Sequence, residues 1–173
     1  VLVNNAGVLA SFRITELDEH NLADVYAANV FSHYYCAGEA ARRMARSRGG
    51  QGGVIVNIAS DAARVGSSGE AVYAACKGGL VSFSKTIARE HARHGITVNV
   101  VCPGPTDTAL LAGFAEGAAN PEKLMDAFKK AIPLGRLGQP NDLAGAIVFF
   151  GSDDASFITG QVISVSGGLT MHG

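Results

Sequence analysis

Three polar residues of this 173-residue chain have types and spacing suited to proton transfer. Tyr73 and Lys77 lie four residues apart in a helical stretch, which places them about 40° apart on one helix face. Leu80 and Ile87 fall on the same face, so Lys77 should point toward the core, where an amine is costly without a partner. An ammonium beside a phenol favours the phenolate, and Lys77 is therefore expected to lower the pKa of Tyr73. Ser60, thirteen residues before the tyrosine, could then hydrogen-bond a substrate oxygen.

Each of these residues also has a purely structural interpretation. Tyr73 could be a buried tyrosine whose hydroxyl has a partner, and Lys77 a side chain that extends to water near a helix end. Ser60 could cap a turn after a strand. These interpretations are preferred for each residue taken alone, whereas the three residues together favour acid–base chemistry.

The segments around these residues alternate between strands and helices. Short runs rich in β-branched residues predict strands at Val1–Val3, Val54–Ser60, Ile96–Val101 and Gln161–Val165. Longer stretches predict helices over about Asp18–Arg48 and Val72–His94, and from Pro140 to near Gly151. This βαβ alternation predicts an α/β fold with a parallel sheet. The wholly apolar first strand should lie inside that sheet, with neighbours on both sides.

Residues at the helix ends support these boundaries. Thr15 and Asp18 have the spacing of a capping box before the first helix. Gly95 is suited to end the second helix, and Pro140 is suited to the first turn of the third. Between Pro103 and Pro140 the chain is rich in glycine and proline, which predicts a loose lid at about residues 105–138 with one short helix near Glu122–Lys130.

The predicted topology places the three polar residues at one edge of the sheet. Ligands in open α/β sheets bind at the carboxyl ends of strands. Ser60 ends a predicted strand, and the helix that carries Tyr73 and Lys77 begins at the same edge. We therefore expect these side chains to meet at a ligand site.

Composition excludes several other classes of protein. Lys and Arg number 14 and Asp and Glu 15, so the net charge is −1, without the basic surface that nucleic acid binding needs. The longest apolar stretch, Ala144–Gly151, is far shorter than the roughly 20 residues that span a membrane. The three cysteines form no C-x-x-C pair, which predicts no disulfide framework and no metal site and suits a cytoplasmic protein. No internal repeat or linker is visible, which predicts a single domain over residues 1–173.

The amino end looks truncated. The chain begins on Val1, without an initiator methionine or a leader, and enters a predicted strand at once. We expect that about 80 further residues upstream would complete a doubly wound sheet. We also expect that the fragment alone would aggregate, because one edge of its sheet would be open. It should also bind no dinucleotide and be inactive, because the turn that binds the pyrophosphate would lie in the missing upstream part.

A set of motifs runs in a fixed order along nearly the whole chain. The set comprises Asn4-Asn5-Ala6-Gly7, Asn29 in Tyr26-Ala-Ala-Asn29-Val30, Ser60, Tyr73-x-x-x-Lys77, Asn99, Pro103-Gly104, Thr108 and Gly160-Gln161 through Gly167-Gly168. It resembles the short-chain dehydrogenase/reductase family, a branch of the Rossmann folds. The resemblance implies a Rossmann-like doubly wound parallel sheet, present here as its carboxyl-terminal portion. It also implies NAD(P)-dependent transfer of a hydride between a nicotinamide cofactor and a secondary alcohol or ketone.

The resemblance implies roles for four catalytic residues. Tyr73 would be the general acid/base, Ser60 would orient the substrate oxygen, and Lys77 would lower the tyrosine pKa while binding the nicotinamide ribose. Asn29 would hold a water that links Lys77 to solvent. Its structural alternative is an asparagine that kinks its helix.

The resemblance also implies a cofactor site. Asn5, Ala6 and Gly7 would pass the adenosine side of the cofactor, where small residues permit close approach of the backbone. The nicotinamide carboxamide would be held by Pro103, Gly104, Thr106 and Thr108. The family's glycine-rich turn and its cofactor selector belong upstream of Val1. Either NAD or NADP is therefore expected, with NAD favoured.

Several segments resemble particular branches of the family. Gly95–Val101, Pro133–Pro140 and Ile158–Gln161 resemble 3-oxoacyl-thioester reductases, whereas Thr106–Leu111 and Ser164–Gly173 resemble 2-hydroxycyclohexanecarboxyl-CoA dehydrogenases. The implied substrate is an alcohol or ketone, either a CoA or acyl-carrier thioester or some other secondary alcohol.

Two further questions concern catalysis and assembly. The alternative to an enzyme is a non-catalytic member that binds dinucleotide and regulates or scaffolds a partner. Retention of Asn29, Ser60, Tyr73 and Lys77 favours the enzyme.

Small and apolar residues occur on more than one side of the helices at Tyr26–Arg48 and Val72–His94, which predicts a homo-oligomer, either a tetramer or a dimer.

Overall fold

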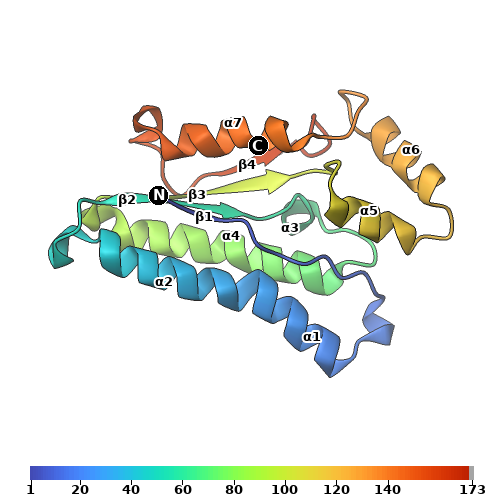
Figure 1. Ribbon diagram of the computed structural model, residues 1–173, viewed down its shortest axis with the longest axis horizontal. Helices are drawn as coiled ribbons and strands as arrows, with labels where there is room; N and C mark the ends of the chain where they lie inside the picture. The colour runs from blue at the N-terminus through green and yellow to red at the C-terminus, as the bar shows by residue number, and fades with distance from the viewer. Residues whose placement is uncertain (172–173) are drawn as a thin grey trace.

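Four strands form a single parallel sheet in the order β1-β2-β3-β4 in the computed structural model, which describes residues 1–171 (Figure 1). The strands are β1 (Leu2–Asn4), β2 (Gly53–Ile58), β3 (Ile96–Pro103) and β4 (Val162–Val165). All four predicted strands are present, although their ends differ by up to two residues. In particular, β2 ends at Ile58, so Ser60 follows the strand and does not end it as predicted.

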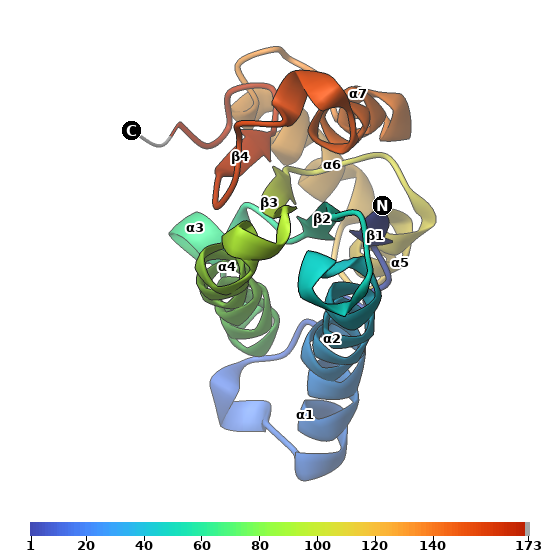
Figure 2. The same cartoon turned by 90° about the vertical axis from the view of Figure 1, so that its left-hand side faces the viewer.

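Helices cover both faces of the sheet, as Figure 2 shows. On one face lie α2 (Ser32–Met44) and α4 (Ala71–His91), and on the other lies α7 (Pro140–Gly151). Alternate residues of β2 therefore enter different cores. Ile55 packs with Ala37 and Ala41 of α2, whereas Val56 packs with Phe150 of α7. Burial on both faces explains why the central strands are continuously apolar, and it confirms the doubly wound α/β class.

The predicted helix at Asp18–Arg48 is divided into three parts. Helix α1 (Glu19–Tyr26) passes into a π-helical turn at Ala27–Phe31, and α2 then continues to Met44. A short 3-10 turn (Arg46–Arg48) follows α2. The predicted capping box was wrong, because Asp18 is itself the N-cap and its carboxylate accepts from the backbone N–H groups of His20 and Asn21.

The ends of the other two predicted helices are close to their expected places. Helix α4 ends at His91, and a 3-10 turn (Ala92–His94) then leads to Gly95. Gly95 adopts the left-handed conformation, with φ of 73°, as expected for a residue that ends a helix. Pro140 begins α7. The remaining short elements are a 3-10 turn at Ile14–Glu16, α3 (Ala62–Val65) and a 3-10 turn at Asp153–Ala155.

The segment at 105–138 is more regular than predicted. It contains two helices, α5 (Ala109–Glu116) and α6 (Pro121–Ala131), of which only α6 was expected. Thr108 caps α5 by accepting from the backbone N–H of Leu111, and Asn120 caps α6 by accepting from that of Lys123. Within residues 1–171, no helix is both long and apolar enough to cross a membrane.

Candidate active site

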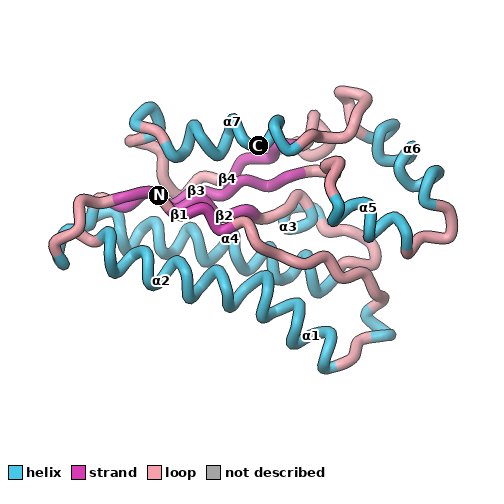
Figure 3. Tube along the Cα trace, in the orientation of Figure 1, coloured by secondary structure: helices cyan, strands magenta, loops and turns pink. Residues whose placement is uncertain are grey.

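The loops that leave β1, β2 and β3 lie at the edge of the sheet where α5 and α6 are also found (Figure 3). A cavity of about 690 Å³ opens there. Ten of the eleven residues assigned to catalysis or cofactor binding line it: Asn5, Gly7, Asn29, Ser60, Tyr73, Lys77, Pro103, Gly104, Thr106 and Thr108. Ala6 is exposed and does not line the cavity. The structure thus brings together residues that are up to about a hundred positions apart in the chain.

Ser60 lies in the turn between β2 and α3. Its hydroxyl oxygen accepts a hydrogen bond from the backbone N–H of Ala62 at 3.2 Å. The hydroxyl proton therefore remains available to a partner in the cavity. Ser60 and Tyr73 line the same cavity.

Tyr73 and Lys77 lie on the sheet-facing side of α4, as the sequence period predicted. Tyr73 is 8% exposed and Lys77 is 3% exposed. The Lys77 ammonium lies 5.8 Å from the centre of the Tyr73 ring. It donates a hydrogen bond of 3.0 Å to the carbonyl of Ile58, the last residue of β2. The end of β2 thus fixes the position of the lysine beside the tyrosine ring.

The pKa of Tyr73 differs from the prediction. Burial raises the pKa of this phenol above its ordinary value, and the hydrogen bond with Ser60 only partly opposes the rise. Lys77 was expected to lower the tyrosine pKa, but its ammonium is directed to the Ile58 carbonyl. Burial also lowers the pKa of Lys77 itself, to about 8. Burial is thus the largest cause of both pKa shifts.

Asn29 is fully buried in the π-helical turn between α1 and α2. Its amide nitrogen donates to the carbonyls of Val8 and Val25, at 2.9 and 3.0 Å, so the side chain is held from two sides. The amide oxygen has no hydrogen-bond partner within the described chain. Such a π-turn often marks a functional site, because it turns one side chain out of the regular helical pattern.

Gly7 closes one wall of the cavity against these residues. A Cβ atom at this position would lie 2.7 Å from the Asn29 amide oxygen and 3.3 Å from the Lys77 ammonium. The close approach leaves no room for a side chain. The side chains of Asn29 and Lys77, from two separate elements, thus both approach the point where a Gly7 side chain would begin.

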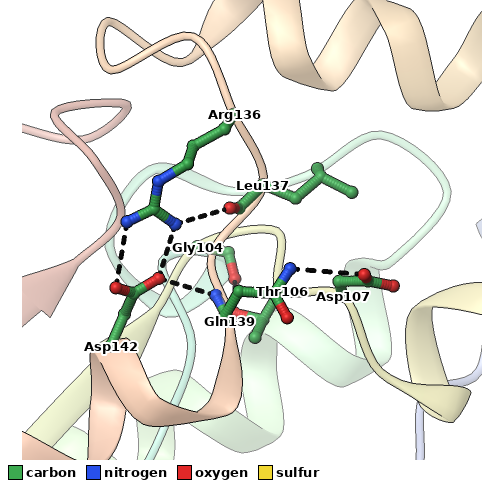
Figure 4. A network of polar contacts seen from close by, with 7 residues as sticks. All are labelled: Gly104, Thr106, Asp107, Arg136, Leu137, Gln139 and Asp142. Carbon is green, nitrogen blue, oxygen red and sulfur yellow. Dashed lines mark hydrogen bonds and ion pairs between the residues drawn. The ribbon is translucent and has the colours of Figure 1, made fainter.

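The 105–138 segment is fastened at both ends beside the cavity (Figure 4). Thr106 and Gly138 form a parallel bridge, and the backbone N–H of Gly138 donates to Pro105 at 2.9 Å. Arg136 holds Asp142 of α7 through two hydrogen bonds, of 2.6 and 3.0 Å. Asp142 also accepts from the backbone N–H of Gln139. The helices α5 and α6 therefore extend from a closed base.

Several lining residues were not identified from the sequence. The 105–138 segment contributes a largely apolar wall, and the chain after β4 contributes further apolar residues. The wall comprises Leu110, Leu111, Phe114, Phe128, Leu169 and Met171. The helical spacing of Leu110, Leu111 and Phe114 could have indicated this wall, but the nearby glycines suggested a loop. Asp61 and Glu70 also line the cavity and carry no motif that distinguishes them.

The residues present fit the ribose and nicotinamide end of a dinucleotide. Lys77 uses one hydrogen bond to the protein, to Ile58, and its ammonium has three donors. The free acceptor of Asn29 and the side-chain-free backbone of Gly7 lie next to it. Polar groups for hydroxyls and an amide therefore converge in a cavity that is otherwise largely apolar. Among residues 1–171, no group of three or more His, Cys, Asp or Glu side chains could hold a metal ion.

A family model described as enoyl-(acyl carrier protein) reductase matches residues 1–170 of this chain. The chain belongs to the short-chain dehydrogenase/reductase family. A solved structure, ElxO with NADP bound, is similar over 97% of this chain and 66% of its own, with 31% identity and a TM-score of 0.85. This similarity confirms the Rossmann-like fold.

Characterised and uncharacterised relatives match almost the whole chain. The chain is 36% identical over 171 residues to the 3-oxoacyl-(acyl-carrier-protein) reductase FabG of Vibrio cholerae. This match covers 99% of the chain and 66% of the relative. The chain is also 35% identical over 170 residues to an uncharacterised oxidoreductase of Thermotoga maritima. That match covers 98% of the chain and 66% of the relative. The chain thus spans about two thirds of the length of these relatives.

Proposed function

We propose that this protein is an NAD(P)-dependent oxidoreductase that transfers a hydride between a nicotinamide cofactor and a secondary alcohol or ketone. The observation that carries the proposal is the meeting of Asn29, Ser60, Tyr73 and Lys77 in one cavity. The cofactor supplies or takes the hydride. Residues 1–173 would then form one oxidoreductase domain, with the 105–138 segment as its substrate lid.

The side chains divide the proton chemistry among themselves. Ser60 hydrogen-bonds the substrate oxygen, and the Tyr73 hydroxyl gives its proton to that oxygen during reduction and takes it back during oxidation. The raised pKa of Tyr73 keeps the phenol protonated, which suits a proton donor. Lys77 binds the ribose hydroxyls and, as it does so, brings positive charge to the phenol. Asn29 connects Lys77 to solvent through a water.

A thioester is the substrate that the relatives favour. FabG is named as a reductase of 3-oxoacyl groups on an acyl carrier protein. The cavity has a largely apolar wall, which suits the acyl or alicyclic part of a hydroxyacyl thioester of CoA or an acyl carrier. NADP is bound in the similar structure of ElxO, whereas the sequence favoured NAD. Activity should therefore be measured with both cofactors.

We also propose that the protein is cytoplasmic and forms a homotetramer.

A non-catalytic dinucleotide-binding protein is the competing function. It is disfavoured because a binding protein could use Lys77 for the ribose hydroxyls but has no need of the Ser60 and Tyr73 hydroxyls at the same cavity, which proton transfer requires. Oxidation of NADH and NADPH by the intact protein in the presence of a panel of ketones and 3-oxoacyl thioesters distinguishes the two. Turnover with any member supports the enzyme. Cofactor binding without turnover of any member supports the alternative.

A further inference from the structure

The wall of the cavity carries few ionisable groups. Among the described residues that line it, these are Asp61, Glu70, Tyr73 and Lys77, and no arginine or histidine is present. The charge that a substrate meets therefore depends on which of these four side chains face it.

Two of the four are turned into the protein. The Lys77 ammonium is 3% exposed and donates to the Ile58 carbonyl beneath the tyrosine ring. Asp61 is 5% exposed, and one of its carboxylate oxygens accepts from the hydroxyl of Ser164. Its other oxygen is buried. Lys77 is thus committed to Ile58 and to the proposed ribose site, and Asp61 to Ser164, which leaves Glu70 as the remaining charged group at the wall.

Glu70 is different in position and in exposure. It is the N-cap residue of α4, three residues before Tyr73, and it is half-buried at the cavity wall. Its charge acts on Tyr73, where after burial and the Ser60 hydrogen bond it contributes to the raised pKa of the phenol. Glu70 therefore lines the same cavity as Tyr73 and lies about one helical turn before it on the chain.

No cation of the described chain neutralises Glu70. None of the ion pairs among residues 1–171 includes it. Arg64, on the adjacent α3, donates instead to Ser164 and to the carbonyl of Val162. The backbone N–H of Glu70 donates to the carbonyl of Ser67, which is uncharged. Glu70 is thus a carboxylate without an ion-pair partner at the wall of this cavity.

We propose that Glu70 is a specificity-determining residue that rejects substrates carrying a free carboxylate next to the reacting carbonyl. Two negative charges in a partly desolvated cavity repel each other strongly, whereas a neutral ester, thioester or amide escapes the repulsion. A ketone with a nearby ammonium should be favoured. The inference deepens the proposed function and rests on it.

Three small ketones of similar size test this selectivity: methyl 3-oxobutanoate (neutral), 3-oxobutanoate (anionic) and aminoacetone (cationic). Their kcat/KM values are compared in the intact protein and in Glu70→Gln, which keeps the shape and removes the charge. We expect the preference for the methyl ester over the free acid to fall about tenfold in Glu70→Gln, and the rate with aminoacetone to fall relative to the ester. The matched control is Glu90→Gln, the same change at an exposed position of the same helix, which should leave all ratios unchanged.

The pH dependence provides a second measure. Burial raises the pKa of Glu70, with the Ser67 hydrogen bond opposing. Discrimination against 3-oxobutanoate should therefore weaken as the pH falls through that raised pKa and should be independent of pH over the same range in Glu70→Gln. Turnover with unchanged selectivity in Glu70→Gln would overturn the role of Glu70. Absence of turnover with every ketone and both cofactors would instead overturn the proposed function, and the inference with it.

Discussion

The amide oxygen of Asn29 and the ammonium of Lys77 lie 2.7 and 3.3 Å from one point in space, the place where Gly7 would carry a Cβ atom. Asn29 belongs to a π-helical turn, Lys77 to α4 and Gly7 to the loop after β1. Three elements therefore have to be in register for this close approach. Its geometry makes Gly7 a sensitive reporter of the whole site.

Gly7→Ala should reduce catalysis more than it reduces stability. The new methyl group would lie 2.7 Å from the Asn29 oxygen, and Asn29 cannot move freely because two hydrogen bonds hold its amide. We expect kcat/KM to fall by about tenfold to a hundredfold, because a displacement of this size near reacting groups has such an effect. Steady-state kinetics measure the loss. The control is Gly145→Ala, at an exposed helical position with open space around it, where a gain of up to about 1 kcal/mol in stability is expected. Wild-type kinetics in Gly7→Ala would contradict the proposed contact.

Tyr73→Phe should abolish nearly all turnover and leave cofactor affinity almost unchanged. The ring keeps its packing, and only the hydroxyl that supplies the proton is removed. Stopped-flow or steady-state assays measure turnover, and fluorescence titration with NADH and NADPH measures affinity. In Lys77→Ala, by contrast, both turnover and cofactor affinity should fall. Turnover near wild type in Tyr73→Phe would disprove its role as the acid.

Lys77 should make the stability of the fold depend on pH in a particular direction. Its folded-state pKa of about 8 lies below the ordinary value for lysine, so the unfolded chain binds the proton more tightly. The penalty for burying the charge is constant below about pH 8, and stability should rise as the pH increases from there toward the unfolded pKa. Urea denaturation of wild type and Lys77→Met at several pH values measures the difference. Below pH 8 the free energy of unfolding of Lys77→Met should exceed that of wild type by a few kcal/mol. Above pH 8 this difference should become smaller. Lys85→Met, exposed on the same helix, serves as the control. A gap that did not change with pH would show that Lys77 is not buried in its charged form.

Asp142→Asn should loosen the base of the 105–138 segment. The Arg136 side chain holds the pKa of Asp142 down to about 2, so the ion pair persists at every pH above that value and is lost as the pH falls through it. In the variant, amide hydrogen exchange should accelerate at Arg136–Gln139 and in the first turn of α7, while the buried part of α4 keeps its protection. Unchanged exchange at Gln139 would show that the backbone bridge alone closes the base.

The open edge of β1 should cause this chain to associate with itself. Val1 is 75% exposed and Val3 is 41% exposed, and within residues 1–171 the strand has a neighbour on one side only. Val3→Lys should shift residues 1–173 toward the monomer in size-exclusion chromatography with light scattering. Val148→Lys places the same charge on exposed α7 and should have a smaller effect. A larger shift toward the monomer in Val148→Lys than in Val3→Lys would place the association surface on α7.

Much of the architecture was predictable because the signals are local. The β-branched runs and the glycine at position 95 fix strands and a helix end within a few residues. The 3.6-residue period alone placed Tyr73 and Lys77 on the face that the structure buries. Order along the chain and the rule that ligands bind at the carboxyl ends of strands then predicted where these residues would meet.

Other features depend on contacts that no short segment encodes. The π-turn around Asn29 is stabilised by a hydrogen bond to Val8, which is 21 positions away. Helix α5 contains Gly113, which lowers helix propensity, yet Leu111 is buried against Ile132 and Leu137. The direction of the Tyr73 pKa shift depends on how deeply the ring is buried, and periodicity shows the face but not the depth.

The bridge between Thr106 and Gly138 and the Arg136–Asp142 ion pair close the base of the excursion that carries α5 and α6. The excursion is also tied to the chain after β4, because the backbone N–H of Leu134 donates to the carbonyl of Gly167. The two helices leave and return above this base, so their length and shape can change without disturbing the end of β3 or the start of α7. Substrate range can therefore diversify by exchange of α5 and α6. The residues proposed for proton transfer, on α4 and in the turn after β2, would stay the same while the substrate-binding wall changes.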